Sequence, residues 1–345
     1  MTATGLIPRK RLERIPHEMR LAHEYCFFLH DQCVHLLVQY EAAEAHHVKV
    51  KFRSKVEAAT FAEVANTDSI EALRATGYPV QARRVILNAI TMAMVSDTLH
   101  HIFEALKCME KRKTVVALNL LRKPLLDSLV YLSWMLGDED AFYTAFTSGD
   151  PAALSPKMLG NLRARIIEQA LAKTEVATVL NADFLRETLF SAKNDYGLYR
   201  LFQHAVHLVT VERIELRTEP ENFNFIFKRH SDDDIYHAVY EVLPHLLLYL
   251  AHVMLELFER IASMDEGAKR AFQVRSIFGL SLLEGGEGAE DVTTRLGTLQ
   301  AKFTCTDCGT ALTVTPHNAS RITLTESYRC PKCRRVHGFP FAWMF

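Results

Sequence analysis

Apolar residues recur at three- and four-residue spacing along nearly the whole chain up to about residue 285. That spacing gathers them on one face of an α-helix, and a convincing two-residue alternation, typical of strands, is absent. We therefore predict an all-α helical bundle. The expected helices cover residues 16–47, 50–64, 80–110, 113–136, 139–147, 156–171, 182–192, 195–210, 232–262 and 266–283.

The helical pattern ends at a glycine-rich run, Leu283-Glu-Gly-Gly-Glu-Gly. Such a run predicts a linker. Beyond it, Thr310–Thr315 and Arg321–Ser327 are rich in β-branched residues, which favours short strands. The sequence thus predicts a helical domain at 1–285, a linker at 286–300 and a small C-terminal β domain at 301–345.

The C-terminal part carries four cysteines as two Cys-x2-Cys pairs, Cys305/Cys308 and Cys330/Cys333. Two such turns point four thiolates at one ion and complete a closed tetrahedral shell. A segment this short buries too little apolar surface to fold alone, so a metal must supply the difference. We predict a zinc ribbon with one structural Zn²⁺ per chain. Free thiols and two disulfides are the alternatives.

The composition is that of a soluble globular protein, with 49% apolar and 23% charged residues in 345. The longest apolar stretch, Val242–Phe258, is interrupted by proline, histidine and glutamate, so we predict no membrane span. The start of the chain lacks the apolar region of a signal peptide. The three cysteines outside the ribbon are an odd set, which fits free thiols in a reducing cytoplasm.

Charge is distributed unevenly. From residue 301 onward six Lys and Arg residues oppose two carboxylates, while the whole chain has a net charge of −1. Arg329, Lys332, Arg334 and Arg335 crowd the second cysteine pair, and such a basic patch is suited to the phosphates of nucleic acid. A solvated edge, or docking onto the acidic helical part, would explain the same pattern.

The segment from Tyr196 to Val209 has an unusual helical wheel. Arg200, His204 and His207 fall on one narrow stripe, and apolar residues cover the remaining circumference. A helix that is apolar nearly all round belongs in an interior or an interface. We therefore predict a buried helix whose stripe meets carboxylates, an anionic ligand, or the same stripe of a second copy across a dimer axis.

Other polar positions have ordinary explanations. In the first helix His23, Cys26, His30 and Cys33 are predicted to belong to a packed core face, because they span too long a stretch to share one metal. In the helix at 232–262 the polar side, which includes His245 and His252, is predicted to face solvent. The aromatic tail from Phe339 is expected to form a strand that packs on the body or on another subunit.

Two stretches resemble an uncharacterised bacterial all-helical family. They are Ala117-Leu-Asn-Leu-Leu-Arg-Lys-Pro-Leu-Leu-Asp127 with the aromatic helix after it, and Tyr196-Gly-Leu-Tyr-Arg-Leu-Phe-Gln-His204-Ala-Val-His207. The family has Glu where this chain has Asp127, and Ser near Gln203. More distantly, such domains resemble the HEPN superfamily of bacterial toxin and phage-defence proteins.

The HEPN resemblance implies a function. Its ribonuclease members carry an Arg-x4–6-His motif at a dimer interface, and Arg200 with His207 has this spacing, as does Arg11 with His17. By this resemblance His207 or His204 would act as general base on a ribose hydroxyl, and Arg200 would stabilise charge on the phosphate.

The leading hypothesis is a cytoplasmic, homodimeric bacterial defence or toxin-like protein whose zinc ribbon recognises nucleic acid or a partner. In its enzymatic version the protein is a metal-independent ribonuclease. One alternative is a non-enzymatic sensor or adaptor, in which the ribbon and the aromatic tail dock a protein partner. Another is a helical bundle that grips a small anionic ligand with Arg200 and the histidines.

Overall fold

The computed structural model describes residues 4–160, 162–211, 217–224, 229, 231–300 and 303–344. The helices of the main bundle are α1 (Arg9–Leu12), α2 (Arg20–Ala42), α5 (Pro79–Met109), α6 (Thr114–Lys123), α7 (Leu129–Gly137), α8 (Glu139–Thr147), α9 (Pro156–Gly160), α10 (Arg163–Leu171), α11 (Ala182–Phe190), α12 (Leu198–Val206), α13 (Asp234–Ile261) and α14 (Glu266–Glu284). These bounds confirm the predicted all-helical body, most of them within a few residues.

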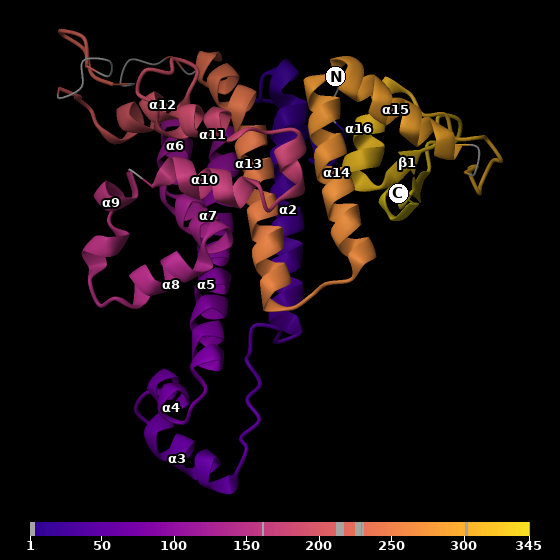
Figure 1. Cartoon of the computed structure of the whole chain (residues 1–345). Helices are drawn as coiled ribbons and strands as arrows, with labels where there is room; N and C mark the ends of the chain where they lie inside the picture. Colours follow the sequence, from indigo (N-terminus) through magenta and orange to yellow (C-terminus); the bar gives the residue numbers. More distant parts are fainter. Residues whose placement is uncertain are drawn as a thin grey trace.

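The long helices α2, α5 and α13 form the centre of the bundle, and α6, α7 and α10 cover one side of it (Figure 1). Their contact surfaces supply large side chains that are fully buried, such as Tyr25, Tyr249 and Phe258. Burying each such side chain stabilises the fold by roughly 1.5–3 kcal/mol. On the other side α14 packs against α2, where the Tyr25 hydroxyl donates to the Ser276 carbonyl at 2.7 Å.

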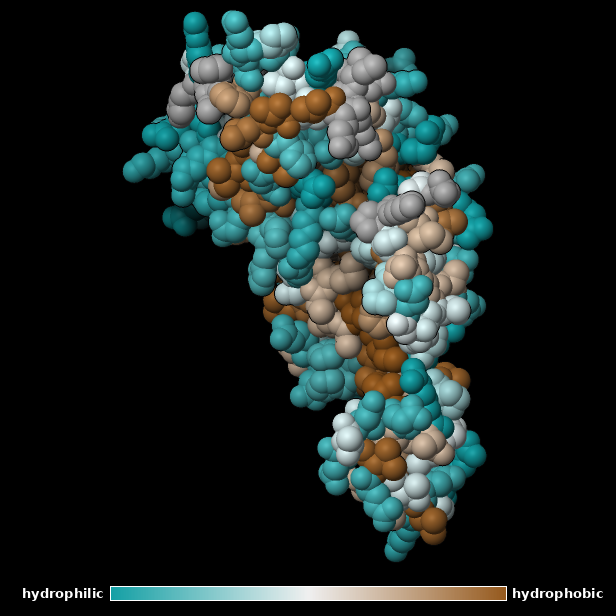
Figure 2. All heavy atoms as spheres, turned by 90° about the vertical axis from the view of Figure 1, so that its left-hand side faces the viewer, coloured by the Kyte–Doolittle hydropathy of each residue, from teal (hydrophilic) through white to brown (hydrophobic). Residues whose placement is uncertain are grey.

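A small helical lobe projects from one end of the bundle. It consists of α3 (Lys55–Ala65) and α4 (Ser69–Ala75), inserted between α2 and α5. Its own apolar cluster is built around Tyr78, against which Phe52 packs edge to face. Figure 2 shows the lobe as a separate knob at the lower end of the molecule. The sequence predicted the first of these helices but not α4.

The helix predicted at 113–136 has an interruption. Pro124 lacks the N–H that an α-helix needs, and residues Pro124–Ser128 take a π-helical turn between α6 and α7. Both flanking helices continue in the same direction along the bundle and bury Leu121 and Leu129 in the core.

The predicted linker at 286–300 is wrong, because these residues form helix α15 (Gly286–Gln300). Gly285 and Gly286, with φ of 80° and 62°, turn the chain after α14, and the next helix begins at once. Its buried residues Ala289, Val292, Leu296 and Leu299 have helical spacing. The run of glycines concealed this pattern in the sequence.

The C-terminal module also differs from the prediction. Residues 321–325 are part of helix α16 (Pro316–Thr325), which begins with a capping box between Thr315 and Asn318 and has Pro316 in its first turn. These start signals outweigh the β-branched composition. The module contains one two-stranded antiparallel sheet, β1 (Ser327–Arg329) with β2 (Val336–Gly338), and an isolated bridge between Thr304 and Ala311.

The aromatic tail packs on the body, as predicted, but as a 3₁₀ turn rather than a strand. Phe339 and Phe341 are buried, and the Phe341 ring stacks on Phe278 of α14. The turn covers Phe341–Met344, and its last two residues, Trp343 and Met344, remain about half exposed.

Arg275 of α14 fastens the module to the bundle. Its guanidinium donates to the Thr323 and Leu324 carbonyls at the end of α16, at 3.2 and 2.8 Å, and pairs with Glu326 at 3.2 Å. It also lies over the Phe28 ring of α2. The module therefore shares a buried interface with the helical body.

Helix α13 is long and apolar enough to cross a membrane, but 83% of its most apolar window is buried inside the protein. It is the core helix of the bundle. The expectation that its histidines face solvent is wrong for His252, which is fully buried and lies 2.9 Å from the Ser276 hydroxyl. Helix α14 covers this side of α13. His23, Cys26, His30 and Cys33 are buried, as the core interpretation predicted.

Candidate metal centre and basic knuckle

Two turns of the same geometry carry the four cysteines. In the first, the Gly309 N–H donates to the Cys305 carbonyl at 2.9 Å and the Cys305 N–H to the Thr310 carbonyl at 2.8 Å. The second repeats both bonds with Cys330, Arg334 and Arg335, at 3.0 and 2.8 Å. We call residues 329–335 the basic knuckle.

The two turns bring all four thiols together. The Sγ atoms of Cys305, Cys308, Cys330 and Cys333 lie within 4.8 Å of one another. The distance between the Cys305 and Cys333 sulfurs is 3.5 Å, and that between Cys308 and Cys330 is 3.6 Å. A tetrahedral ion with metal–sulfur bonds of about 2.3 Å requires edges of roughly 3.8 Å, so the cluster has the size of a metal site.

The pKa values of these thiols depend on hydrogen bonds to the turns and on the neighbouring sulfurs. The Thr310 hydroxyl and backbone N–H hold the pKa of Cys308 at about 6, well below its usual value. The pKa of Cys333 is raised to about 12: a bond from the Arg335 backbone favours the thiolate, but burial and the neighbouring thiols outweigh it. Four thiolates at this spacing repel one another unless a cation lies between them.

His337 is a residue that the sequence reasoning missed. Its Nε2 atom lies 3.1 Å from the Cys305 sulfur and 3.5 Å from the Asp307 carboxylate. Cys305, Asp307 and His337 form a second set with ligand spacing. His337 lies outside the set of four cysteines, and its contact with the Cys305 sulfur is of the kind that orients a metal ligand. The sequence signal was its position four residues after Cys333.

The basic residues named from the sequence lie around the second turn. Arg329, Lys332, Arg334 and Arg335 are all exposed. Arg335 is paired with Asp307, at 3.6 Å, and the Arg329 Nε donates to the Arg334 carbonyl at 3.2 Å. The four side chains therefore form an accessible cationic surface on a turn fastened by two of the cysteines.

Arg200, His204 and His207 do not lie on a buried helix, and that premise of the ribonuclease hypothesis is wrong. The Arg200 side chain is 34% exposed and forms an ion pair with Asp195. His204 is half-buried, and His207 is exposed at the end of α12. Within α12 only Leu198 and Phe202 are buried.

The helical wheel failed because it included residues beyond the helix. Helix α12 ends at Val206, and His207 takes an extended conformation. Leu208 and Val209, which filled the apolar circumference in the sequence, follow it and are 62% and 49% exposed. Arg200 and His204, four residues apart within α12, nonetheless share one side of the helix, and His207 follows directly after its end.

We compared the chain with models of protein families, with curated proteins and with solved structures. None of them matches it. The resemblance to the HEPN superfamily and to the bacterial helical family thus finds no support in these comparisons.

Proposed function

We propose that the C-terminal module binds nucleic acid, and RNA in particular, through the basic knuckle, with one Zn²⁺ ion held by Cys305, Cys308, Cys330 and Cys333. Four thiolates in a closed tetrahedral set are the typical ligands of structural zinc. The ion would fix both turns and so hold the cationic side chains in place. It supplies no open coordination position and therefore no catalysis.

The conformation of Arg334 is the observation that carries this proposal. Its φ is 66°, in the left-handed region, and the equivalent residue of the first turn is Gly309, with φ of 65°. Glycine adopts this conformation without strain, whereas an L residue with a side chain pays about 1–2 kcal/mol. No described contact of the Arg334 side chain offsets that cost. An arginine at this strained position is explained if its charge contacts an external partner.

The test is a binding titration with a fluorescent single-stranded RNA of about 20 nucleotides at several salt concentrations. The variant R329A/K332A/R334A/R335A should bind more weakly and should flatten the slope of log K against log salt by roughly three units. The matched control is K49A/K51A/R53A/K55A, which removes four exposed cations from the lobe around α3, at the far end of the molecule (Figure 1).

If the two quadruple variants weaken RNA binding equally, the basic knuckle contributes only through the general positive charge of the protein and is not a specific binding site. Absence of binding by the wild-type protein at low salt would contradict the proposal and favour the sensor or adaptor hypothesis. In that case the exposed end of the aromatic tail, Trp343 and Met344, would be the part left to dock a protein.

Ribonuclease activity is a second candidate, favoured by the accessibility of the α12 stripe. Arg200 and His207 reach solvent, and exposed apolar side chains flank His207: Val206, Leu208, Val209 and Val211. We propose that two copies meet over these residues and bring both stripes together. Apolar residues gather on the upper part of the face in Figure 2.

The two parts of this candidate are tested separately. H207A should abolish RNA cleavage without a loss of thermal stability, because the side chain is exposed and supports no core contact. L208E/V209E should convert a dimer to a monomer in light scattering. A monomeric wild-type protein that leaves RNA intact would remove the candidate.

A further inference from the structure

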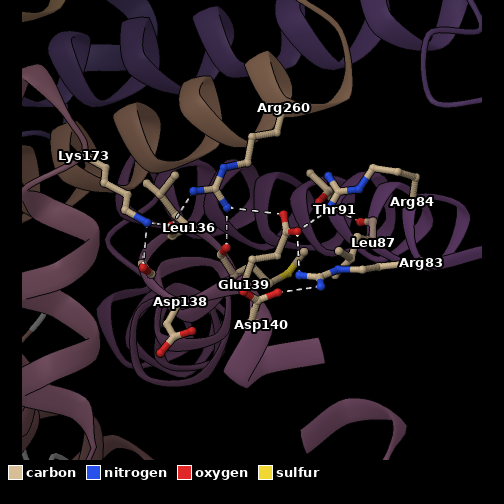
Figure 3. A network of polar contacts seen from close by, with 12 residues as sticks. Arg83, Arg84, Leu87, Thr91, Leu136, Asp138, Glu139, Asp140, Lys173 and Arg260 are labelled. Carbon is tan, nitrogen blue, oxygen red and sulfur yellow. Dashed lines mark hydrogen bonds and ion pairs between the residues drawn. The ribbon is translucent and has the colours of Figure 1, made fainter. Parts of the chain in front are cut away.

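An open, shallow cavity of about 640 Å³ lies at the surface of the helical body, away from the metal module. Its walls come from four parts of the chain (Figure 3). Arg83 and Arg84 lie on α5, Glu139 begins α8, Lys173 follows α10, and Arg260 lies near the end of α13. The volume is within the range of small-molecule sites.

Two of the four cations support the end of α7. Lys173 Nζ donates to the Leu136 and Gly137 carbonyls at 3.0 and 2.7 Å. Arg260 donates to the Met135 and Leu136 carbonyls at 2.7 and 2.5 Å. Cations are stabilising at a helix C-terminus, where carbonyl groups lack partners. Lys173 and Arg260 therefore have a structural role.

Arg83 and Arg84 make no bond to the end of α7, and both turn toward Glu139. Arg83 also lies over the Tyr143 ring of α8, 4.9 Å from its centroid. Glu139 Oε1 accepts from Arg83 Nη2 at 2.9 Å and from Arg84 Nη2, while its Oε2 lies 3.4 Å from Arg260. The pKa of Glu139 is lowered: burial opposes ionisation, but the Arg84 contact and the other arginines outweigh it. Three guanidinium groups thus lie against the single carboxylate of Glu139.

Donor groups remain unused around this carboxylate. The Nε of Arg83 is buried without a hydrogen-bond partner. In the described part of the chain Arg84 makes only the bond to Glu139. Asp140 pairs with Arg83 at 2.5 Å, but its side chain is 85% exposed and can turn away into solvent. Asp138 caps α8 through the Ala141 N–H and contributes no bond to the arginines.

We infer that this cavity binds a phosphate-bearing small molecule, with Arg83 and Arg84 as the residues that grip the phosphoryl oxygens. Two adjacent guanidinium groups offer the paired donors that phosphate favours. Lys173 and Arg260 add positive charge to the lining of the cavity, and Glu139 orients Arg83 and Arg84 when the ligand is absent. The site is independent of the nucleic-acid proposal, because it shares no residue with the knuckle.

The experiment follows thermal unfolding of the full chain while inorganic pyrophosphate is added to about 10 mM, with sodium chloride matched for ionic strength. Pyrophosphate should raise the melting temperature of the wild-type protein. R84Q should weaken the apparent affinity about tenfold, the effect of one charge-assisted contact. D140N should strengthen it several-fold, because it removes a competing carboxylate.

R295Q is the matched control, since Arg295 is an exposed arginine of α15 paired with Asp291. It should bind pyrophosphate like the wild-type protein. The inference is overturned if pyrophosphate has no effect beyond that of matched salt, or if R84Q and R295Q bind equally well. Should R84Q fold poorly, the gain expected for D140N still decides the question, because Asp140 is exposed and the substitution keeps both arginines while it removes the carboxylate paired with Arg83.

Discussion

Replacement of Arg334 by glycine should have opposite effects on stability and on RNA binding. The left-handed backbone at this position costs an arginine about 1–2 kcal/mol, and glycine removes that cost. Glycine in turn gives the unfolded chain more freedom, worth roughly 0.5–1 kcal/mol. The exposed side chain makes no described contact that would be lost. R334G should therefore stabilise the folded knuckle by about 0.5–1 kcal/mol.

The same substitution removes one of four cations. Loss of one phosphate contact to the single-stranded RNA should lower the slope of log K against log salt by about 0.7 and weaken RNA binding several-fold. Stability is measured by competition with a zinc chelator, in which 0.5–1 kcal/mol corresponds to roughly a two- to fivefold shift of the midpoint. Binding is measured by anisotropy with the same RNA.

K332A is the matched control, because it removes a neighbouring charge without relieving backbone strain. It should weaken RNA binding to a similar extent and leave the chelator midpoint unchanged. The reasoning is refuted if R334G retains its metal no better than K332A does, or if it binds RNA as tightly as the wild-type protein.

Three further predictions concern the fold and the metal. Glu110 is almost fully buried, and the imidazole of His23, 3.5 Å away, together with bonds from Arg11 and Lys107 outweighs the burial of its carboxyl and lowers its pKa to about 2. A carboxyl whose pKa is lowered in the folded state stabilises the fold at pH values above its unfolded pKa of about 4.5. E110Q should therefore lower the free energy of unfolding by about 3 kcal/mol at pH 7 and by roughly half of that at pH 3. Urea unfolding at both pH values checks this, and a loss that does not shrink on acidification would contradict it. R275M should destabilise the attachment of the module by about 2–4 kcal/mol, because two carbonyls at the end of α16 lose their donor, and faster proteolysis after α15 should report it. Chelation of the metal should abolish RNA binding at low salt, and binding that survives chelation would separate the knuckle from the metal.

Helix positions followed from the sequence because each long helix repeats its apolar face several times. Helix α8 begins and ends at the predicted residues, and α5 is displaced by one. The errors lie where a local signal competes with packing. The glycines before α15 suggested a linker, and the β-branched residues of α16 suggested a strand, whereas capping and burial favoured helices in both places.

The candidate sites differ in the same way: a site fixed by local sequence could be predicted, whereas a site that depends on tertiary packing could not. The cysteine cluster was predictable, because two ligands with two residues between them fix a local turn whatever the rest of the chain does. The Arg200 stripe was misplaced, since its burial depended on where α12 ends and on what covers it. The cavity around Glu139 could not be predicted, because its charged residues come from separate elements that only the tertiary fold brings together.

The metal content of the purified protein tests the central claim most directly. Elemental analysis of the full chain, purified without added metal, should find one zinc ion per chain. The variant C330S/C333S should contain close to none, because it removes half of the ligand set. A wild-type protein without zinc, or a variant that keeps its full zinc content, would contradict the assignment of Cys305, Cys308, Cys330 and Cys333 as the metal site.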